Sequence, residues 1–299
     1  MPRILTLDFL PLGARYMLLS AFAFSIMAVF VKAVGGQGIP VLEIVAARSI
    51  ISLILSYVTI KRAGIDFFGQ RKCLLFARGL IGFIALNCVF YSVIHLPLAE
   101  ATVLQYLHPM FTAILALFIL KERPTWGTLI CIILSLLGLI IIVQPSFIFT
   151  PQTQGSDNFP IAVAIAGAFG SALAYTTVRN LNKTEHPQVI VLYFPMIALP
   201  ASLLFLWNDF IMPEGITWVY LLAIGLSTQV GQVALTKSMQ TETASRAASF
   251  AYSQIVFAII LGILFYQEIP GLITLLGTAL IVLGAYISAV WKKTNLISD

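Results

Sequence analysis

Polar residues that could bind a solute stand inside stretches of sequence that are otherwise strongly apolar. They comprise one arginine, one histidine, three tyrosines and several side-chain amides. Inside a lipid bilayer a charged side chain costs at least ~2.5 kcal/mol, so such residues should face a partner or a water-filled cavity. The candidate solute-binding residues are Arg48, Asn87, Tyr91, Gln105, Tyr106, His108, Gln229, Gln232, Tyr252 and Gln254.

Arg48 leaves two interpretations open. It stands about eight residues, or ~12 Å, into its apolar stretch, which is close to the centre of a bilayer. Its planar guanidinium suits a carboxylate or phosphate, so it could contact a solute. Alternatively, it forms an ion pair with Glu43, five residues earlier.

The stretch around His108 carries four polar residues at helical spacing, so that they share one face of a helix. Pro109 lacks an amide proton and should kink that helix beside His108. A single histidine in a membrane is often just a hydrogen-bonded core residue, so we expect His108 to line a cavity rather than to carry protons. The four polar residues are Thr102, Gln105, His108 and Thr112.

The remaining amides and tyrosines lie near the middle of other apolar stretches. A single buried amide often only bridges two helices, at ~0.6 kcal/mol. The amides Asn87, Gln229 and Gln232 nevertheless accompany several mid-depth tyrosines. That combination predicts a cavity suited to a polar, partly flat metabolite.

Ten apolar stretches must position these residues. The 299 residues are 60% hydrophobic and 10% charged, and the mean hydropathy of +0.98 excludes a soluble domain. Each stretch has roughly 17 to 23 residues, enough to cross ~30 Å of hydrocarbon as a helix, and none shows the alternation of a barrel strand. We therefore predict an all-α membrane protein of ten transmembrane helices, at 15–34, 41–60, 74–95, 99–120, 126–143, 159–178, 189–207, 216–239, 245–266 and 271–290.

Basic residues predict the orientation in the membrane. Lysine and arginine gather in every second loop, for example at 61–62, 71–72 and 121–123, whereas the intervening loops hold Asp157, Asp209, Glu214 and Glu268. Positive charge marks cytoplasmic loops, so both termini should be cytoplasmic, as in a protein of the inner cell membrane. Loop topology thus explains the net charge of +5 without nucleic acid.

The two halves of the sequence match each other at an offset of 146 residues. Because each half has an odd number of spans, the second copy should be inverted in the membrane, as in many secondary transporters. We predict a first repeat at 1–145, an extracytoplasmic linker at 146–158 and a second repeat at 159–299. The matched pairs are Ser25 and Ser171, Gly79 and Gly225, Tyr106 and Tyr252, Glu122 and Glu268, Pro124 and Pro270, and Gly138 and Gly284.

The stretches from Leu98 to Pro124 and from Ala244 to Pro270 resemble the repeat signature of the drug/metabolite transporter superfamily, specifically its EamA-type members. With the ten-span layout, the resemblance covers essentially the whole chain. It implies a DMT/EamA-like fold and transport of a small solute. Arg48 resembles an arginine often seen in that family's second span. The resemblance does not select a substrate.

The expected function is alternating-access transport of a small organic metabolite, such as an amino acid or derivative, a nucleoside-like solute or an S-adenosylmethionine-like solute. No Gly-Lys-Ser/Thr phosphate loop is present to supply a motor. The cysteines and histidines show no metal-site spacing, so we expect no cofactor and no enzyme. A membrane-embedded lipid-modifying enzyme or a lipid translocase is the alternative. The partners would be the solute, the bilayer and, in a homodimer, a second copy.

Overall fold

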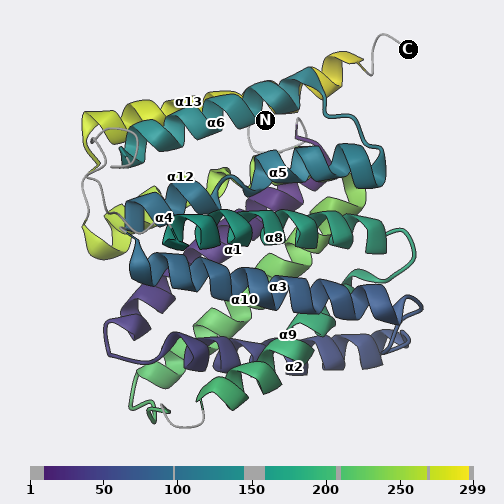
Figure 1. The fold of residues 1–299 in the computed structure, drawn as a ribbon, viewed down its shortest axis with the longest axis vertical. Helices are drawn as coiled ribbons and strands as arrows, with labels where there is room; N and C mark the ends of the chain where they lie inside the picture. Colours follow the sequence, from purple (N-terminus) through teal and green to yellow (C-terminus); the bar gives the residue numbers. More distant parts are fainter. Residues whose placement is uncertain (1–9, 97, 145–158, 207–209, 268–269, 296–299) are drawn as a thin grey trace, which may run out of the picture.

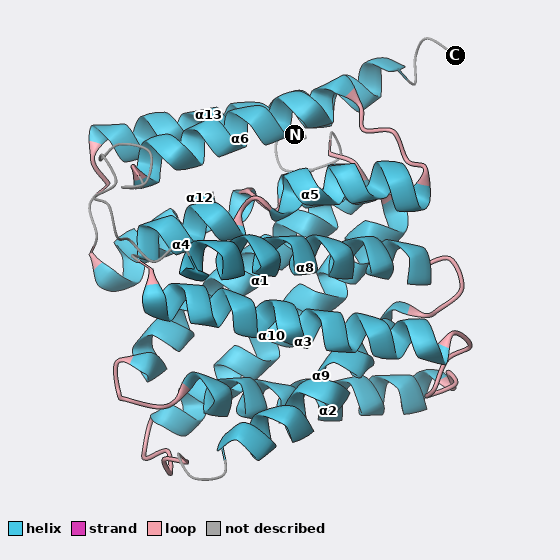
Figure 2. Cartoon of the chain, viewed as in Figure 1, coloured by secondary structure: helices cyan, strands magenta, loops and turns pink. Residues whose placement is uncertain are grey.

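The computed structural model describes residues 10–96, 98–144, 159–206, 210–267 and 270–295, and every regular element in these ranges is a helix (Figure 2). The helices lie in stacked layers and run roughly along one common direction (Figure 1). They are α1 (Leu12–Gly35), α2 (Val41–Ala63), α3 (Lys72–His95), α4 (Leu98–Gln105), α5 (His108–Leu115), the π-helical turn η2 (Ala116–Leu120), α6 (Trp126–Val143), α8 (Phe159–Leu181), α9 (Pro187–Leu206), α10 (Thr217–Thr241), α11 (Ala244–Phe250), α12 (Ser253–Tyr266) and α13 (Leu272–Asn295).

Ten helical spans in the described residues are long and apolar enough to cross a membrane, as predicted. The predicted boundaries differ from the observed ones by at most a few residues at each end. Many large apolar side chains remain exposed on the outer faces of the helices, for example Phe118, Leu204 and Leu272. Such surfaces suit hydrocarbon rather than water, and they are typical of a bundle embedded in lipid.

Two spans are interrupted at mid-length. One breaks at Tyr106 and Leu107, between α4 and α5, and Pro109 stands in the first turn of α5. The helix is thus interrupted directly before His108, which confirms the predicted kink. Pro109 costs no helical bond there, because the first residues of a helix donate none. The other break separates α11 from α12 at Tyr252, without a proline.

The two breaks meet in space. The rings of Tyr106 and Tyr252 stack with their centroids 5.8 Å apart, and the Tyr252 hydroxyl donates to the Tyr106 carbonyl over 2.9 Å. This bond satisfies a backbone oxygen at the break, where the regular helical pattern is interrupted. Tyr106 and Tyr252, which correspond to each other at the offset of 146 residues, are therefore in direct contact.

The helices of the first half pack mainly on helices of the second half. The principal pairs are α1 with α10, α3 with α8, α2 with α9, and α6 with α13, and α6 and α13 lie side by side at the top of Figure 1. In the last pair the backbones approach closely at Gly138 and Gly277, where a side chain on either residue would collide with the other's carbonyl oxygen. Small residues permit this distance, as is usual in membranes.

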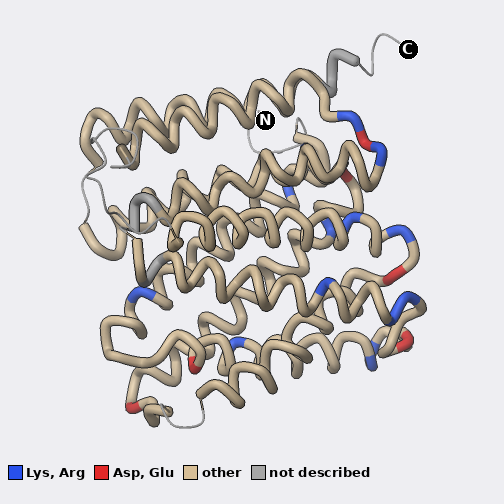
Figure 3. Tube along the Cα trace, viewed as in Figure 1, with Lys and Arg blue, Asp and Glu red and all other residues tan. Residues whose placement is uncertain are grey.

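Charged residues divide the bundle into two unlike ends. Most lysines and arginines lie at the right-hand end of the view in Figure 3, which we call the basic end. It holds Lys61 and Arg62 at the end of α2 and Lys72 at the start of α3. Asp157, Asp209 and Glu268, predicted for the opposite loops, lie outside the described residues.

The N-terminal end of α1 and the C-terminal end of α13 both lie at the basic end. The Ser238 hydroxyl, late in α10, donates to the Gly13 carbonyl at the start of α1 over 2.7 Å. Arg246 of α11 donates to the Ser288 carbonyl in the last part of α13, also over 2.7 Å. The two termini were predicted to be cytoplasmic. That prediction concerns residues 1–9 and 296–299, which lie outside the described residues.

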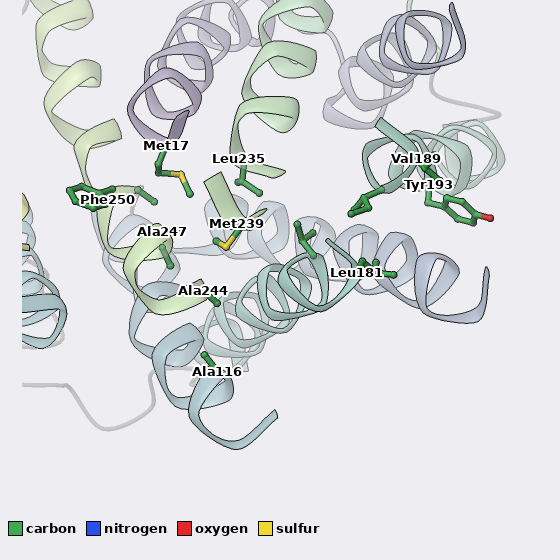
Figure 4. Close-up of a cluster of buried hydrophobic side chains, with 14 of the residues drawn as sticks. Met17, Ala116, Leu181, Val189, Tyr193, Leu235, Met239, Ala244, Ala247 and Phe250 are labelled. Carbon is green, nitrogen blue, oxygen red and sulfur yellow. The ribbon is translucent and has the colours of Figure 1, made fainter. Parts of the chain in front are cut away.

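A packed apolar cluster fills the bundle near the basic end (Figure 4). Most of its side chains come from α1, α8, α9, α10 and α11, single ones come from α2, α3, η2 and α13, and they are almost completely buried. Among its members are Met17, Leu181, Val189, Met239, Ala244, Ala247 and Phe250. We call these residues the basic-end cluster.

Candidate functional site

A cavity of about 210 Å³ lies in the middle of the bundle, and every span except α6 and α13 contributes to its wall. This volume is below the size of a typical drug-binding pocket. The cavity therefore has room for a small metabolite.

The basic-end cluster separates this cavity from the basic end. In α10 the cavity residue is Gln232, and the cluster residue Met239 follows it toward the basic end. The same order holds in α8, where Tyr175 lines the cavity and Leu181 belongs to the cluster. The structure is therefore closed between the cavity and the basic end.

Six of the ten predicted site residues line the cavity, although they come from four different spans. This shared position is what the sequence pattern predicted, while their roles in binding stay a prediction. The six are Arg48, Gln105, Tyr106, His108, Gln232 and Gln254.

Asn87 and Tyr91 lie on α3 but are absent from the cavity wall. The Asn87 amide donates to the Phe83 carbonyl one turn earlier, over 2.8 Å. The Tyr91 ring stacks on His95 with 3.9 Å between centroids. The Tyr91 ring also meets the Phe159 ring of α8 edge-on, with 5.9 Å between centroids, so both side chains make contacts outside the cavity in this structure.

Gln229 and Tyr252 also lie away from the cavity wall. Gln229 hydrogen-bonds to the hydroxyl groups of Ser52 and Ser56, and so bridges α10 to α2. Tyr252 is only 1% exposed and lies behind Tyr106, to whose carbonyl it donates. Gln229 thus behaves as the helix-bridging amide that the sequence left open as an alternative.

Arg78 is a cavity residue that the sequence analysis missed. It lies on α3 and is 5% exposed, similar to Arg48 at 8%. Both guanidinium carbons lie over the ring of Phe194, at 5.2 Å for Arg48 and 5.6 Å for Arg78. The two cations therefore share one aromatic ring at the centre of the protein.

Arg48 does not pair with Glu43. The Glu43 carboxylate instead accepts the Ile211 amide proton over 3.1 Å. The contact of Arg48 is a weak one, from Nη1 to the Met27 sulfur at 4.0 Å, and its Nε has no hydrogen-bond partner among the described residues. The ion-pair interpretation of Arg48 is therefore wrong for this structure.

Arg78 is similarly short of acceptors. Its Nη2 donates to the Gln232 side-chain oxygen over 3.3 Å, while its Nε and Nη1 find no acceptor in the described part of the chain. An arginine has five N–H donors and no acceptor, so the described residues leave much of the hydrogen-bonding capacity of Arg78 unused.

Aromatic and neutral polar groups complete the wall. The His108 ring meets the Tyr175 ring edge-on, with 5.1 Å between centroids, and lies 6.0 Å from the Tyr106 ring. His108 Nδ1 has no hydrogen-bond partner among the described residues. None of the described residues that line the cavity is acidic. The described residues also contain no group of three or more His, Cys, Asp or Glu side chains that could hold a metal ion.

Comparison with known sequences places these features in context. The sequence profile of the EamA-like transporter family matches residues 11–144 and again residues 158–290. The pseudopaline exporter CntI of Pseudomonas aeruginosa is 33% identical over 290 residues, which cover 97% of this chain and all of that protein. Solute carrier family 35 member G1 of mouse is 32% identical over 270 residues, covering 87% of this chain and 73% of that protein.

A solved crystal structure shares the fold. It superimposes with a TM-score of 0.80 at 17% sequence identity, and the match covers 94% of this chain and 98% of the other. At that identity the likeness concerns the arrangement of the helices alone.

Proposed function

We propose that this protein, which belongs to the EamA-like transporter family, carries a small organic metabolite through its central cavity by alternating access. The chain is a multi-pass integral membrane protein, and its relatives include proteins named as transporters. The observation that carries the proposal is the cavity with polar side chains at mid-length, to whose wall eight of the ten spans contribute. A cavity at that depth is typical of secondary transporters.

The packing of the two halves supports alternating access. Each principal pair has a counterpart when the halves are exchanged, because α1 on α10 corresponds to α3 on α8. Within the α6 and α13 pair, Gly138 faces Gly277 and Gly284 faces Cys131, and an offset of 146 residues interchanges the two contacts. We propose that the halves, 1–145 and 159–299, are inverted repeats that rock about the cavity.

In the conformation described, an ion pair accompanies the basic-end cluster. Arg179 Nε donates to Glu122 Oε1 over 2.8 Å, and Glu122 Oε2 accepts the Ala244 amide proton over 2.9 Å. Arg179 also donates to the carbonyls of Met239 and Gln240. These bonds join the ends of η2, α8, α10 and α11, and must break if the cavity is to open toward the basic end.

Orientation and assembly belong to the same proposal. The basic end should face the cytoplasm of a bacterial-type inner membrane, with both termini on that side, because lysine and arginine mark cytoplasmic loops. The solute is a small organic metabolite, and the protein is a carrier rather than an enzyme. A homodimer is compatible with the apolar outer faces of the helices.

Counterflow in proteoliposomes tests the transport proposal. Vesicles are loaded with one unlabelled metabolite at millimolar concentration and diluted into traces of the same compound in labelled form. A carrier produces transient, saturable accumulation of label inside. A panel of anionic, neutral and cationic metabolites that shows no accumulation above protein-free vesicles would refute the proposed function.

A further inference from the structure

We propose that the transported solute is an organic anion with two negative charges, which Arg48 and Arg78 bind together. The inference rests on the proposed transport function and narrows it to a substrate class. The observation that supports it is the placement of two buried guanidinium groups near the Phe194 ring, in a cavity wall whose described residues include no acid.

The cavity wall carries an excess of positive charge that a solute can neutralise. Burying two cations at mid-membrane costs free energy, and buried cations are normally paired with acidic groups or with a ligand. The Arg48 and Arg78 side chains contact only the Met27 sulfur and the Gln232 amide oxygen through the hydrogen bonds described. An anion bound in the cavity would supply the missing negative charge and would accept from those N–H groups of Arg48 and Arg78 that line the cavity.

The number of arginines sets the charge of the solute. Each guanidinium offers a planar fork that fits one carboxylate or one phosphate edge, with two parallel hydrogen bonds. Two forks match either two carboxylates on one molecule or the two charges of a phosphate monoester. A monoanion would leave one cation uncompensated, and a cation of the S-adenosylmethionine type would be repelled.

Phe194 fixes where the two charges lie. Because both guanidinium carbons lie within 5.6 Å of the centroid of the same ring, the two positive charges lie near one place in the cavity wall. Around them stand neutral polar side chains that can bind the rest of the solute without competing for its charge. These are Gln105, His108, Gln232 and Gln254.

Ligand-induced stabilisation of the purified protein tests the inference. Succinate, succinamic acid and succinamide share one carbon skeleton and carry two, one and no negative charges, and glycerol 3-phosphate and citrate add other anionic groups. A ligand that binds only the folded state raises the unfolding temperature. We expect at least one of the three polyanions to stabilise the protein, and succinamide and agmatine, a cation, to have no effect.

Charge-removing variants link that effect to the site. In Arg48→Gln and Arg78→Gln the affinity for the effective anion should fall about 10- to 100-fold, as expected when a hydrogen-bonded charged partner is lost. Arg48→Lys keeps the charge without the fork and should recover part of the affinity. The matched control is Arg62→Gln, which removes a charge from the exposed end of the same helix.

Transport separates failure of the inference from failure of the function. Counterflow of neutral or cationic metabolites without any anion would overturn the dianion assignment and leave the carrier intact. So would anion binding that both arginine-to-glutamine variants retain. Absence of counterflow for every solute in the panel would instead overturn the transport function itself.

Discussion

Arg48 lies over the ring of Phe194, and the two residues are separated by the same 146 positions that separate Tyr106 from Tyr252. Corresponding positions of the two halves thus meet twice at the centre of the bundle. At one meeting the two residues are identical tyrosines, and at the other one half supplies a cation and the other a ring. The cavity is therefore chemically asymmetric although its frame is repeated, which is the arrangement needed to bind an asymmetric charge distribution.

Replacing Phe194 with leucine should weaken solute binding without abolishing transport. The ring contributes ~0.5–2 kcal/mol of cation–π attraction and holds two guanidinium groups in place. We expect KM for the transported solute to rise about three- to ten-fold, with kcat changed less. Initial rates of uptake into proteoliposomes measure both constants. Phe194→Tyr, which keeps an aromatic face, is the control and should stay near wild type; an equal loss in both variants would contradict the role of the ring.

The cavity arginines should reduce stability rather than provide it. Arg48 and Arg78 are buried without acidic partners in the described residues, so Arg48→Gln and Arg78→Gln should leave the free energy of unfolding unchanged or raise it by ~1 kcal/mol. Thermal unfolding in detergent, without added ligand, measures this change.

Arg246 provides the comparison for those variants, because it is a buried arginine that has hydrogen-bonding and acidic partners. It is 3% exposed, pairs with Glu242 at 3.6 Å and donates to the Ser288 and Ala289 carbonyls. Arg246→Gln leaves these acceptors buried and should cost roughly 3 kcal/mol. If instead the cavity variants lost as much stability as Arg246→Gln, the two cavity arginines would be structural residues.

The sequence predicts the spans well because bilayer thickness sets their length and apolar runs mark them directly. Trp126–Val143 has the same bounds in the structure as in the sequence analysis. The break at Tyr106 was also accessible, since Pro109 provides a local cause. The break at Tyr252 has no proline, and only its repeat relation to Tyr106 could have indicated it.

Arg78 shows why part of the site was missed. The predicted helix that contains Arg78 begins at Leu74, which puts Arg78 about one turn from the membrane surface. An arginine side chain at that depth can reach water. In the structure the helix begins at Lys72. The polar neighbour of Arg78 is distant in sequence, as its contact with Gln232 shows. Conversely, Asn87 and Gln229 looked like site residues because spacing does not show whether an amide bonds to its own helix, to a neighbouring helix or to a cavity.

The crossing of α6 and α13 should not tolerate a methyl group. A Cβ at Gly277 would lie 2.5 Å from the Gly138 carbonyl oxygen, and a Cβ at Gly138 would meet Gly277 in the same way. Gly138→Ala and Gly277→Ala should therefore each lower the free energy of unfolding by about 1–3 kcal/mol. Gly35→Ala, at a helix end with no atom within 4 Å of the added carbon, is the control and should be neutral in the same thermal unfolding assay. Unaltered stability in both crossing variants would show that the helices separate easily there.

Removing the Glu122 carboxylate should open the cavity toward the basic end. The bond from Arg179 to Glu122 is partly exposed, with 21% and 14% of the two side chains accessible, so its loss should shift the conformational equilibrium by only about 1 kcal/mol, or roughly five-fold. A cysteine replacing Ala174 in the cavity wall, in a background without Cys73, Cys88 and Cys131, reports the shift.

Labelling that cysteine with a membrane-impermeant maleimide added from the basic side should be faster in Glu122→Gln and in Arg179→Gln. Because both changes break one shared ion pair, the double variant should be less than additive. Glu214→Gln, which removes an exposed acid before α10 at the opposite end, should leave the rate unchanged. Equal labelling rates in all variants would mean that the basic-end cluster alone holds the cavity closed, since Met239 and Ala244 would then resist opening without help from the ion pair.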